Sequence, residues 1–84
     1  MKKRVKNDFE WGEPVTVQMG RWAPVTIKDP AEALIFLTNR WPAQRNTRYA
    51  TATSTCAAAL RRHVHSLSAR ETFMAAALEA GLLV

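Results

Sequence analysis

The sequence has very little cysteine and glycine. Its single cysteine, Cys56, leaves no partner for a disulfide within the chain, which fits a reducing compartment. The three glycines, Gly12, Gly20 and Gly81, are isolated from one another, so there is no glycine-rich loop to cradle phosphates. These shortages exclude a disulfide-stapled scaffold and a phosphate-loop enzyme.

Long apolar runs are also missing. The longest covers residues 73–78, whereas about 20 apolar residues are needed to span a bilayer. The basic residues 1–6 are followed by Asp8, Glu10 and Glu13 and not by the apolar stretch of a secretion signal. We therefore expect a soluble, cytoplasmic protein with no membrane partner.

Acidic residues are absent between Glu32 and Glu71, although the chain carries arginines throughout that stretch and has a net charge of +5. Such a block can form a positive patch that attracts anionic partners, or a solvated basic face balanced by the acids of residues 8–32. The candidate anion- or partner-binding residues are Arg40, Arg45, Arg48, Arg61 and Arg62.

The length of 84 residues and the apolar content of 48% suit one small domain. Residues 1–8 are charged and lack periodicity, so we expect a flexible basic tail ahead of a single domain at residues 9–84.

Two short alternating segments, residues 15–19 and 23–27, flank Gly20 and predict a β-hairpin. A three-residue loop at residues 20–22 pairs Val17 with Val25 and Val15 with Ile27. We prefer this register because it places the apolar side chains of both strands on one face.

Helix signals follow the hairpin. Asp29 can cap a first helix, with Pro30 at its first position and Glu32 completing a capping box. This helix should end near Trp41, which precedes Pro42. Its core-facing stripe is predicted to be Leu34, Leu37 and Trp41, with Trp41 as the core anchor.

A second helix is predicted from Arg48 to about His65, capped by Asn46 or Thr47. Its predicted inner stripe is Tyr49, Ala52, Cys56, Ala59 or Leu60, and His63.

A third helix should begin at Ser68, three residues before Glu71, and end at Gly81. Its predicted inner face is Phe73, Ala76, Ala77 and Ala80. The expected fold is thus α+β: an N-terminal two-stranded antiparallel β-hairpin followed by three α-helices, in the order β-β-α-α-α.

Several short motifs in this order resemble the small bacterial proteins catalogued as domain of unknown function 982. The resemblance covers about residues 9–84 and is carried by Pro14-Val15, residues 31–34, Trp41-Pro42, Tyr49-Ala50, Ala52, Cys56, Ala59-Leu60, Ala69-Arg70, Phe73, Ala75-Ala76 and Glu79-Ala80. It implies a compact α+β domain and supplies no catalytic residues, because the family has no established activity. One departure is the segment from Arg61 to His65, where the family leads us to expect a small residue or glycine.

Candidate catalytic and metal chemistry is sparse. The soft ligands are Cys56, His63 and His65, without the paired spacing of a zinc site, and Cys56 suits a small buried packing residue. On a helix, His63 would lie about 10 Å from Cys56, which is too far to activate a nucleophile. We expect neither a cofactor nor enzymatic activity.

The predicted hairpin tip carries Arg21 and Trp22, residue types that are enriched in binding hot spots. Trp22 is therefore a candidate exposed contact residue, although it can also fold back over the edge of the sheet.

Three functions remain open, and we rank a protein-interaction or regulatory module first. Nucleic-acid binding through the basic segment 40–62 comes second, because the helix expected to read bases is rich in alanine. A small enzyme comes third.

The edge of the first strand, between Val15 and Met19, contains no charged residue. Such an edge invites pairing with another chain, which predicts a homodimer through residues 15–19. The competing prediction is a monomer whose first strand is shielded by residues 7–12 or by the C-terminal tail.

Overall fold

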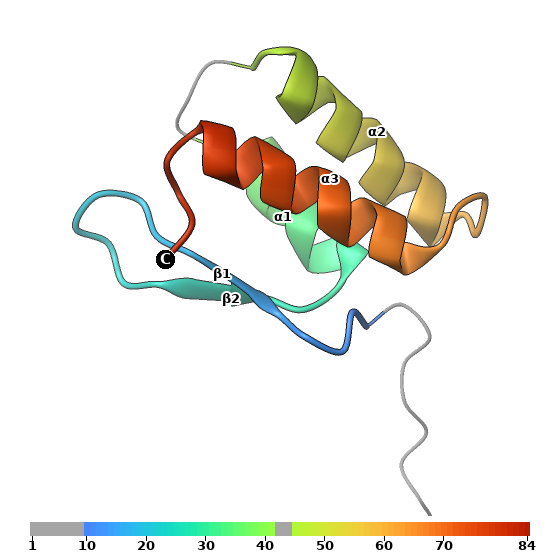
Figure 1. Ribbon diagram of the computed structural model, residues 1–84, viewed down its shortest axis with the longest axis horizontal. Coiled ribbons are helices and arrows are strands. Elements are labelled where there is room, and N and C mark those ends of the chain that lie inside the picture. The colour runs from blue at the N-terminus through green and yellow to red at the C-terminus, as the bar shows by residue number, and fades with distance from the viewer. Residues whose placement is uncertain (1–9, 42–44) are drawn as a thin grey trace, which may run out of the picture.

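The computed structural model of the chain describes residues 10–41 and 45–84. Its elements are β1 (Val15–Val17), β2 (Val25–Ile27), α1 (Pro30–Asn39), α2 (Thr47–Leu60) and α3 (Ser66–Glu79). The predicted α+β order, β-β-α-α-α, is confirmed (Figure 1). The predicted basic tail lies outside the described residues. Within the described ranges, no helix is both long and apolar enough to cross a membrane.

The hairpin has the predicted register, with Val15 opposite Ile27 and Val17 opposite Val25. These four side chains therefore share one face of the sheet. The paired segments are shorter than a three-residue loop implies, because β1 ends at residue 17 and β2 begins only at residue 25. Pro24, which has no backbone N–H to donate, immediately precedes β2.

The C-terminal segment runs back along the outer edge of β1. The N–H of Gln18 donates to the carbonyl of Leu82 (2.8 Å), and the N–H of Val84 donates to the carbonyl of Thr16 (3.3 Å). Leu83 forms an antiparallel bridge with Val17. In Figure 1 the red segment leaves the end of α3 and descends to β1.

This pairing corrects the premise of the predicted homodimer, which was an open edge between Val15 and Met19. That prediction assumed an open edge, but Thr16 and Gln18 already bond to the tail of the same chain. The competing prediction was a first strand covered by residues 7–12 or by the C-terminal tail. The structure shows that the C-terminal tail covers it. The reversal depends on Gly81, which has a left-handed φ of +75° and ends α3 as predicted.

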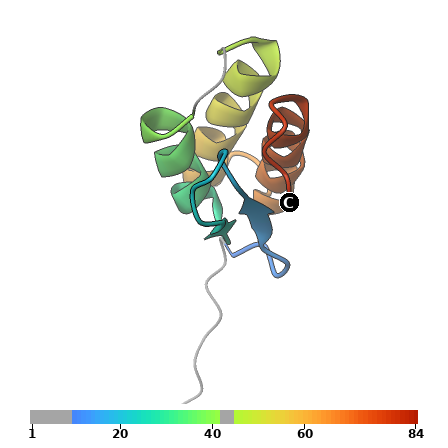
Figure 2. The same ribbon diagram turned by 90° about the vertical axis from the view of Figure 1, so that its left-hand side faces the viewer.

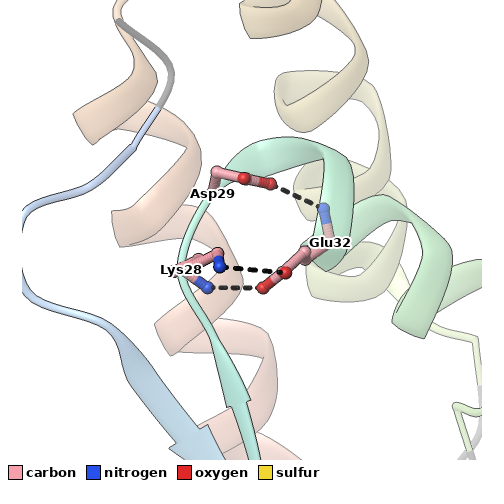
Figure 3. Close-up of polar contacts among 3 residues, drawn as sticks. All are labelled: Lys28, Asp29 and Glu32. Atoms are coloured by element: carbon pink, nitrogen blue, oxygen red, sulfur yellow. Dashed lines mark hydrogen bonds and ion pairs between the residues drawn. The ribbon is translucent and has the colours of Figure 1, made fainter. Parts of the chain in front are cut away.

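The start of α1 follows the predicted cap with one change. Oδ1 of Asp29 accepts a hydrogen bond from the N–H of Glu32 (2.8 Å), as a helix cap requires (Figure 3). The carboxylate of Glu32 reaches one residue further back than in a capping box. Its Oε1 accepts from the backbone N–H of Lys28 (3.0 Å), while its Oε2 lies 3.9 Å from Lys28 Nζ.

Trp41 anchors the corner between α1 and α2, as predicted. Its side chain is 7% exposed and packs against Phe36 (ring centroids 6.0 Å apart) and Tyr49 (5.7 Å). The hydroxyl of Tyr49 donates to the carbonyl of Leu37 (2.8 Å), a group in the last turn of α1 that has no partner within the helix. The side chain of Tyr49 thus packs against Trp41 and also caps the end of α1.

The three helices lie on one side of the sheet, with α2 and α3 side by side (Figures 1 and 2). Small buried residues face each other on these two helices and allow the backbones to approach closely. They are Ala52, Cys56 and Ala59 on α2, and Ala69, Ala76 and Ala77 on α3.

Phe73 lies at the centre of the core and is fully buried. Its ring centroid lies 5.9 Å from that of Trp11 and 6.3 Å from those of Phe36 and Trp41. The predicted stripe of α1 needs one correction: Phe36 is buried, whereas Leu34 is only partly buried at the margin of the core.

We expect the intact protein to be monomeric and a variant lacking residues 82–84 to self-associate. The truncation frees the carbonyl of Thr16 and the N–H of Gln18, which can then pair with another copy. Sedimentation velocity over a dilution series at low temperature measures the difference. Leu82→Ala is the control, because it removes the buried side chain and keeps the backbone pairing. A truncated chain that stays monomeric, or equal association of the control, would contradict this account of the edge.

Candidate functional site

The predicted basic residues fall at opposite ends of α2. Arg45 and Arg48 lie at its start, whereas Arg61 and Arg62 follow its last residue. A helix of 14 residues is about 21 Å long, so the two pairs lie on separate parts of the surface. Arg40 caps the end of α1. The candidate residues of the segment 40–62 therefore do not gather in one compact cluster.

The arginines at the start of α2 make contacts within the fold. The guanidinium of Arg45 lies 5.1 Å from the ring centroid of Tyr49 and donates to the carbonyl of Thr38 in α1 (3.5 Å). Nε of Arg48 lies 3.6 Å from the carboxylate of Glu79 at the end of α3. Both side chains therefore connect α2 to its neighbouring helices.

An open cleft of about 450 Å³ lies between the start of α2 and the end of α3. Its lining residues are Asn46, Thr47, Arg48, Thr51, Thr72, Ala75 and Glu79. The carboxylate of Glu79 also accepts a hydrogen bond from Asn46 Nδ2 (2.9 Å). Because this carboxylate already neutralises Arg48, the cleft is a poor site for a further anion.

The other end of α2 has an unusual C-cap. The N–H of His63 donates to the carbonyl of Ala58 (2.9 Å), and the N–H of Arg62 donates to that of Ala59 (3.0 Å). This pair of bonds is the Schellman arrangement, which places its next-to-last residue in the left-handed region. Arg62 occupies that position with φ +63°. The helix consequently ends at Leu60, five residues before the predicted end near His65.

Arg62 is the one non-glycine residue with a positive φ in the part of the chain that the structure describes. A side chain in this conformation costs about 1–2 kcal/mol relative to glycine. The equivalent position after α3 is filled by a glycine, Gly81, with the same bond pattern. The segment in which the sequence resemblance led us to expect a small residue or glycine is thus also the one that carries backbone strain.

α3 begins two residues earlier than predicted. Nδ1 of His65 accepts a hydrogen bond from the N–H of Leu67 (3.0 Å), so His65 is the N-cap and the helix starts at Ser66. Ser68, the predicted cap, donates its backbone N–H to the carbonyl of His65 (3.0 Å) and lies within the first turn. The cap was missed because histidine is not among the residues that usually occupy this position.

Residues 61–67, which we call the basic turn, form a mixed surface on which every residue except Ser66 is exposed. Val64 is 38% exposed and Leu67 is 47% exposed. Their exposed polar neighbours are Arg61, Arg62, His63 and His65. Within the described residues, Arg61 has no ion-pair partner. The turn therefore offers cationic and apolar groups together, and of these the arginines alone were predicted to contact a partner.

The hairpin tip is a separate exposed feature. Trp22 is 65% exposed and Arg21 is also exposed. The indole therefore does not fold back over the edge of the sheet, which was the alternative for this residue. The backbone carbonyl of Trp22 accepts a hydrogen bond from Gln18 Nε2 (2.8 Å), which holds the tip in place.

Cys56 is fully buried in the middle of α2, as predicted. Burial raises the pKa of its thiol to about 12, so the group stays protonated and unreactive near neutral pH. His63 was predicted to share a helix face with Cys56 but lies beyond the end of the helix. No group of three or more His, Cys, Asp or Glu side chains suited to a metal ion occurs within residues 10–41 and 45–84.

Residues 13–84 match the profile of a family described as "Protein of unknown function (DUF982)". The chain belongs to this family. The solution NMR structure of the Agrobacterium tumefaciens protein Atu1219, a structural genomics target, is similar to the chain with a TM-score of 0.78 and 32% identity. That similarity covers 100% of this chain and 86% of the other. Comparison with curated proteins gave no match.

The DUF982 resemblance expected from the sequence is thus confirmed, and the similar NMR structure has a title that states no activity. The expectations about function consequently depend on the geometry of this chain. The basic turn is its best candidate site, because it combines exposed charge, exposed apolar surface and strain.

Arg62→Gly should raise the free energy of unfolding by about 1 kcal/mol, because glycine adopts the left-handed conformation without strain. In a domain of this size, that gain raises the melting temperature by about 4–8 °C. Arg62→Ala is the control, since it removes the same side chain but keeps Cβ. Equal melting temperatures for the two variants would show that the backbone of Arg62 is unstrained.

Cys56 should lower the stability of the protein in alkaline solution. The folded chain keeps the thiol protonated up to about pH 12, whereas the unfolded chain ionises it near pH 9. Unfolding therefore releases a proton between these values, and the free energy of unfolding falls as the pH rises through that window. Urea denaturation at pH 7 and pH 10 should show a loss of about 1 kcal/mol that Cys56→Ala lacks. Rapid native-state labelling by a thiol reagent at pH 8 would contradict the burial of this residue.

Proposed function

We propose that this DUF982 protein is a small non-catalytic interaction module of the cytoplasm, and that its basic turn binds an acidic surface of a partner protein. Arg61 and the two histidines supply donors for carboxylates. Val64 and Leu67 add apolar area, which carries more of the affinity in most interfaces than exposed charge does.

The conformation of Arg62 is the observation that supports this proposal most strongly. Strained backbone positions persist where a side chain is needed at that place, and they cluster at functional sites. A glycine here would stabilise the fold but would remove a guanidinium from the exposed surface. A requirement for this side chain explains why an arginine stands at a position that favours glycine, and binding is the role that we propose for it.

A protein partner fits the surface better than a nucleic acid does. Binding along a nucleic-acid backbone needs several cations that can reach successive phosphates. Arg45 and Arg48 contact neighbouring helices, and Nε of Arg70 donates to the carbonyl of Glu13 (2.8 Å). Apolar groups also lie among the charges of the basic turn. Nucleic-acid binding is therefore the alternative, and an enzyme ranks third.

A capture experiment with three forms of the protein tests the proposal. Immobilised wild type, Arg61→Ser/Arg62→Gly and Arg21→Ser are each incubated with a lysate of the source cells, once untreated and once treated with nuclease. Arg21→Ser is the matched control, because it removes an exposed arginine at the hairpin tip. We expect a defined protein on the wild type and on Arg21→Ser, but not on the double variant.

The captured protein is then purified, and its affinity is measured by titration calorimetry at two salt concentrations. An acidic partner should bind the double variant about tenfold more weakly, and the difference should shrink at high salt. Recovery that nuclease abolishes would support the nucleic-acid alternative. Equal binding by all three forms would rule out the basic turn as the site.

A further inference from the structure

A groove of about 220 Å³ lies between β2 and α1. Its lining residues are Val25, Thr26, Ile27, Glu32, Ile35, Phe36 and Arg40. None of these residues belongs to the basic turn. The groove is bounded by a strand on one side and a helix on the other, which is the setting in which many domains add an extended peptide to a sheet.

Among the residues that the structure describes, none bonds to the N–H and C=O that Thr26 directs to this side of β2. In an antiparallel strand, successive residues direct their N–H and C=O groups to opposite edges. Thr16 and Gln18 bond outward to the C-terminal segment, so Val15 and Val17 face β2. Their partners across the ladder, Ile27 and Val25, must then face β1, which leaves the N–H and C=O of Thr26 on the outer edge.

The open part of this edge is short. Pro24 has no N–H to donate at one end of the strand. At the other end, the N–H of Lys28 already donates to the carboxylate of Glu32 (Figure 3). An added strand can therefore exchange hydrogen bonds with Thr26 alone, so any bound peptide also needs contacts with α1.

α1 supplies one apolar and one charged contact. Ile35 is 59% exposed although it lines the groove. Arg40 is also exposed, and its guanidinium has no hydrogen-bond or ion-pair partner within the described residues. At 1.5 Å per residue, Glu32 and Arg40 are about 12 Å apart along the helix, the length of about four residues of extended chain.

We propose that this groove binds an extended peptide segment of a partner protein, which pairs with Thr26, places an apolar side chain on Ile35 and directs a carboxylate to Arg40. Alternate side chains of a strand point to the same face, so apolar residues at every second position suit the groove. The carboxylate of the peptide lies at the Arg40 end of the groove. Glu32 lies at the other end, and its own carboxylate is bonded to Lys28. This site is independent of the basic turn, and either proposal can fail without the other.

The probes are two hexapeptides with blocked termini and alternating valine and threonine, one with aspartate in the first position and the other with aspartate in the last. Each is titrated into ¹⁵N-labelled protein and followed by heteronuclear NMR. We expect one of the two to bind with a Kd of about 1 mM or lower and to shift the amide signal of Thr26. Methylation of the peptide amide that pairs with Thr26 should abolish the shift.

Two substitutions test the contacts with α1. Arg40→Gln should weaken binding of the aspartate peptide about threefold to tenfold and leave its asparagine analogue unaffected. Ile35→Ser should weaken both peptides. Arg21→Gln is the matched control for lost charge, and it should bind as the wild type does because Arg21 lies at the hairpin tip.

Three results would overturn the proposal. The first is the absence of any shift at Thr26 with either peptide at millimolar concentration. The second is a set of shifts confined to the basic turn, which would show simple charge attraction. The third is a shift of the Thr26 signal with protein concentration alone, which would show that a second copy of this chain fills the groove.

Discussion

The packing of aromatic rings around Phe73 is the interaction on which the rest of the structure depends. This fully buried ring contacts Trp11 ahead of β1, Phe36 in α1 and Trp41 at the corner that follows α1. Trp41 in turn packs against Tyr49 of α2. Each ring pair adds about 0.5–1.5 kcal/mol beyond the area that it buries. One chain of contacts thereby joins the three helices to the segment that leads into the sheet.

The core is formed by the aromatic cluster and by the small buried residues between α2 and α3. The exposed side chains of the surface features described above do not contribute to it. The C-terminal segment covers the outer edge of β1, while Pro24 and Glu32 shorten the open edge of β2. The exposed features of the described residues include the basic turn, the hairpin tip, the α2–α3 cleft and the groove beside β2. The two proposed contact surfaces are drawn from these exposed regions, and neither depends on residues of the core.

The order of elements, the hairpin register, the cap of α1 and the anchoring role of Trp41 were predictable because each depends on local patterns or on alternation. The C-terminal cover of β1 was predicted only as one of two alternatives to the dimer, since it joins residues more than 60 positions apart and no local pattern marks it. The end of α2 was also mispredicted, because an arginine stands where a glycine would have marked it. Likewise, the candidate arginines were identified by composition, but only the fold separates Arg45 and Arg48 from Arg61 and Arg62.

The stability of a Phe73→Ala variant tests the central role of this ring most directly. Truncating a buried phenylalanine costs about 3–5 kcal/mol, which is most of what so small a domain has. Leu78→Ala is the control, because Leu78 lies on the same helix but is 68% exposed. Thermal unfolding followed by circular dichroism should show no cooperative transition for Phe73→Ala and a nearly wild-type transition for Leu78→Ala. A cooperative melt of Phe73→Ala close to that of the wild type would contradict the account.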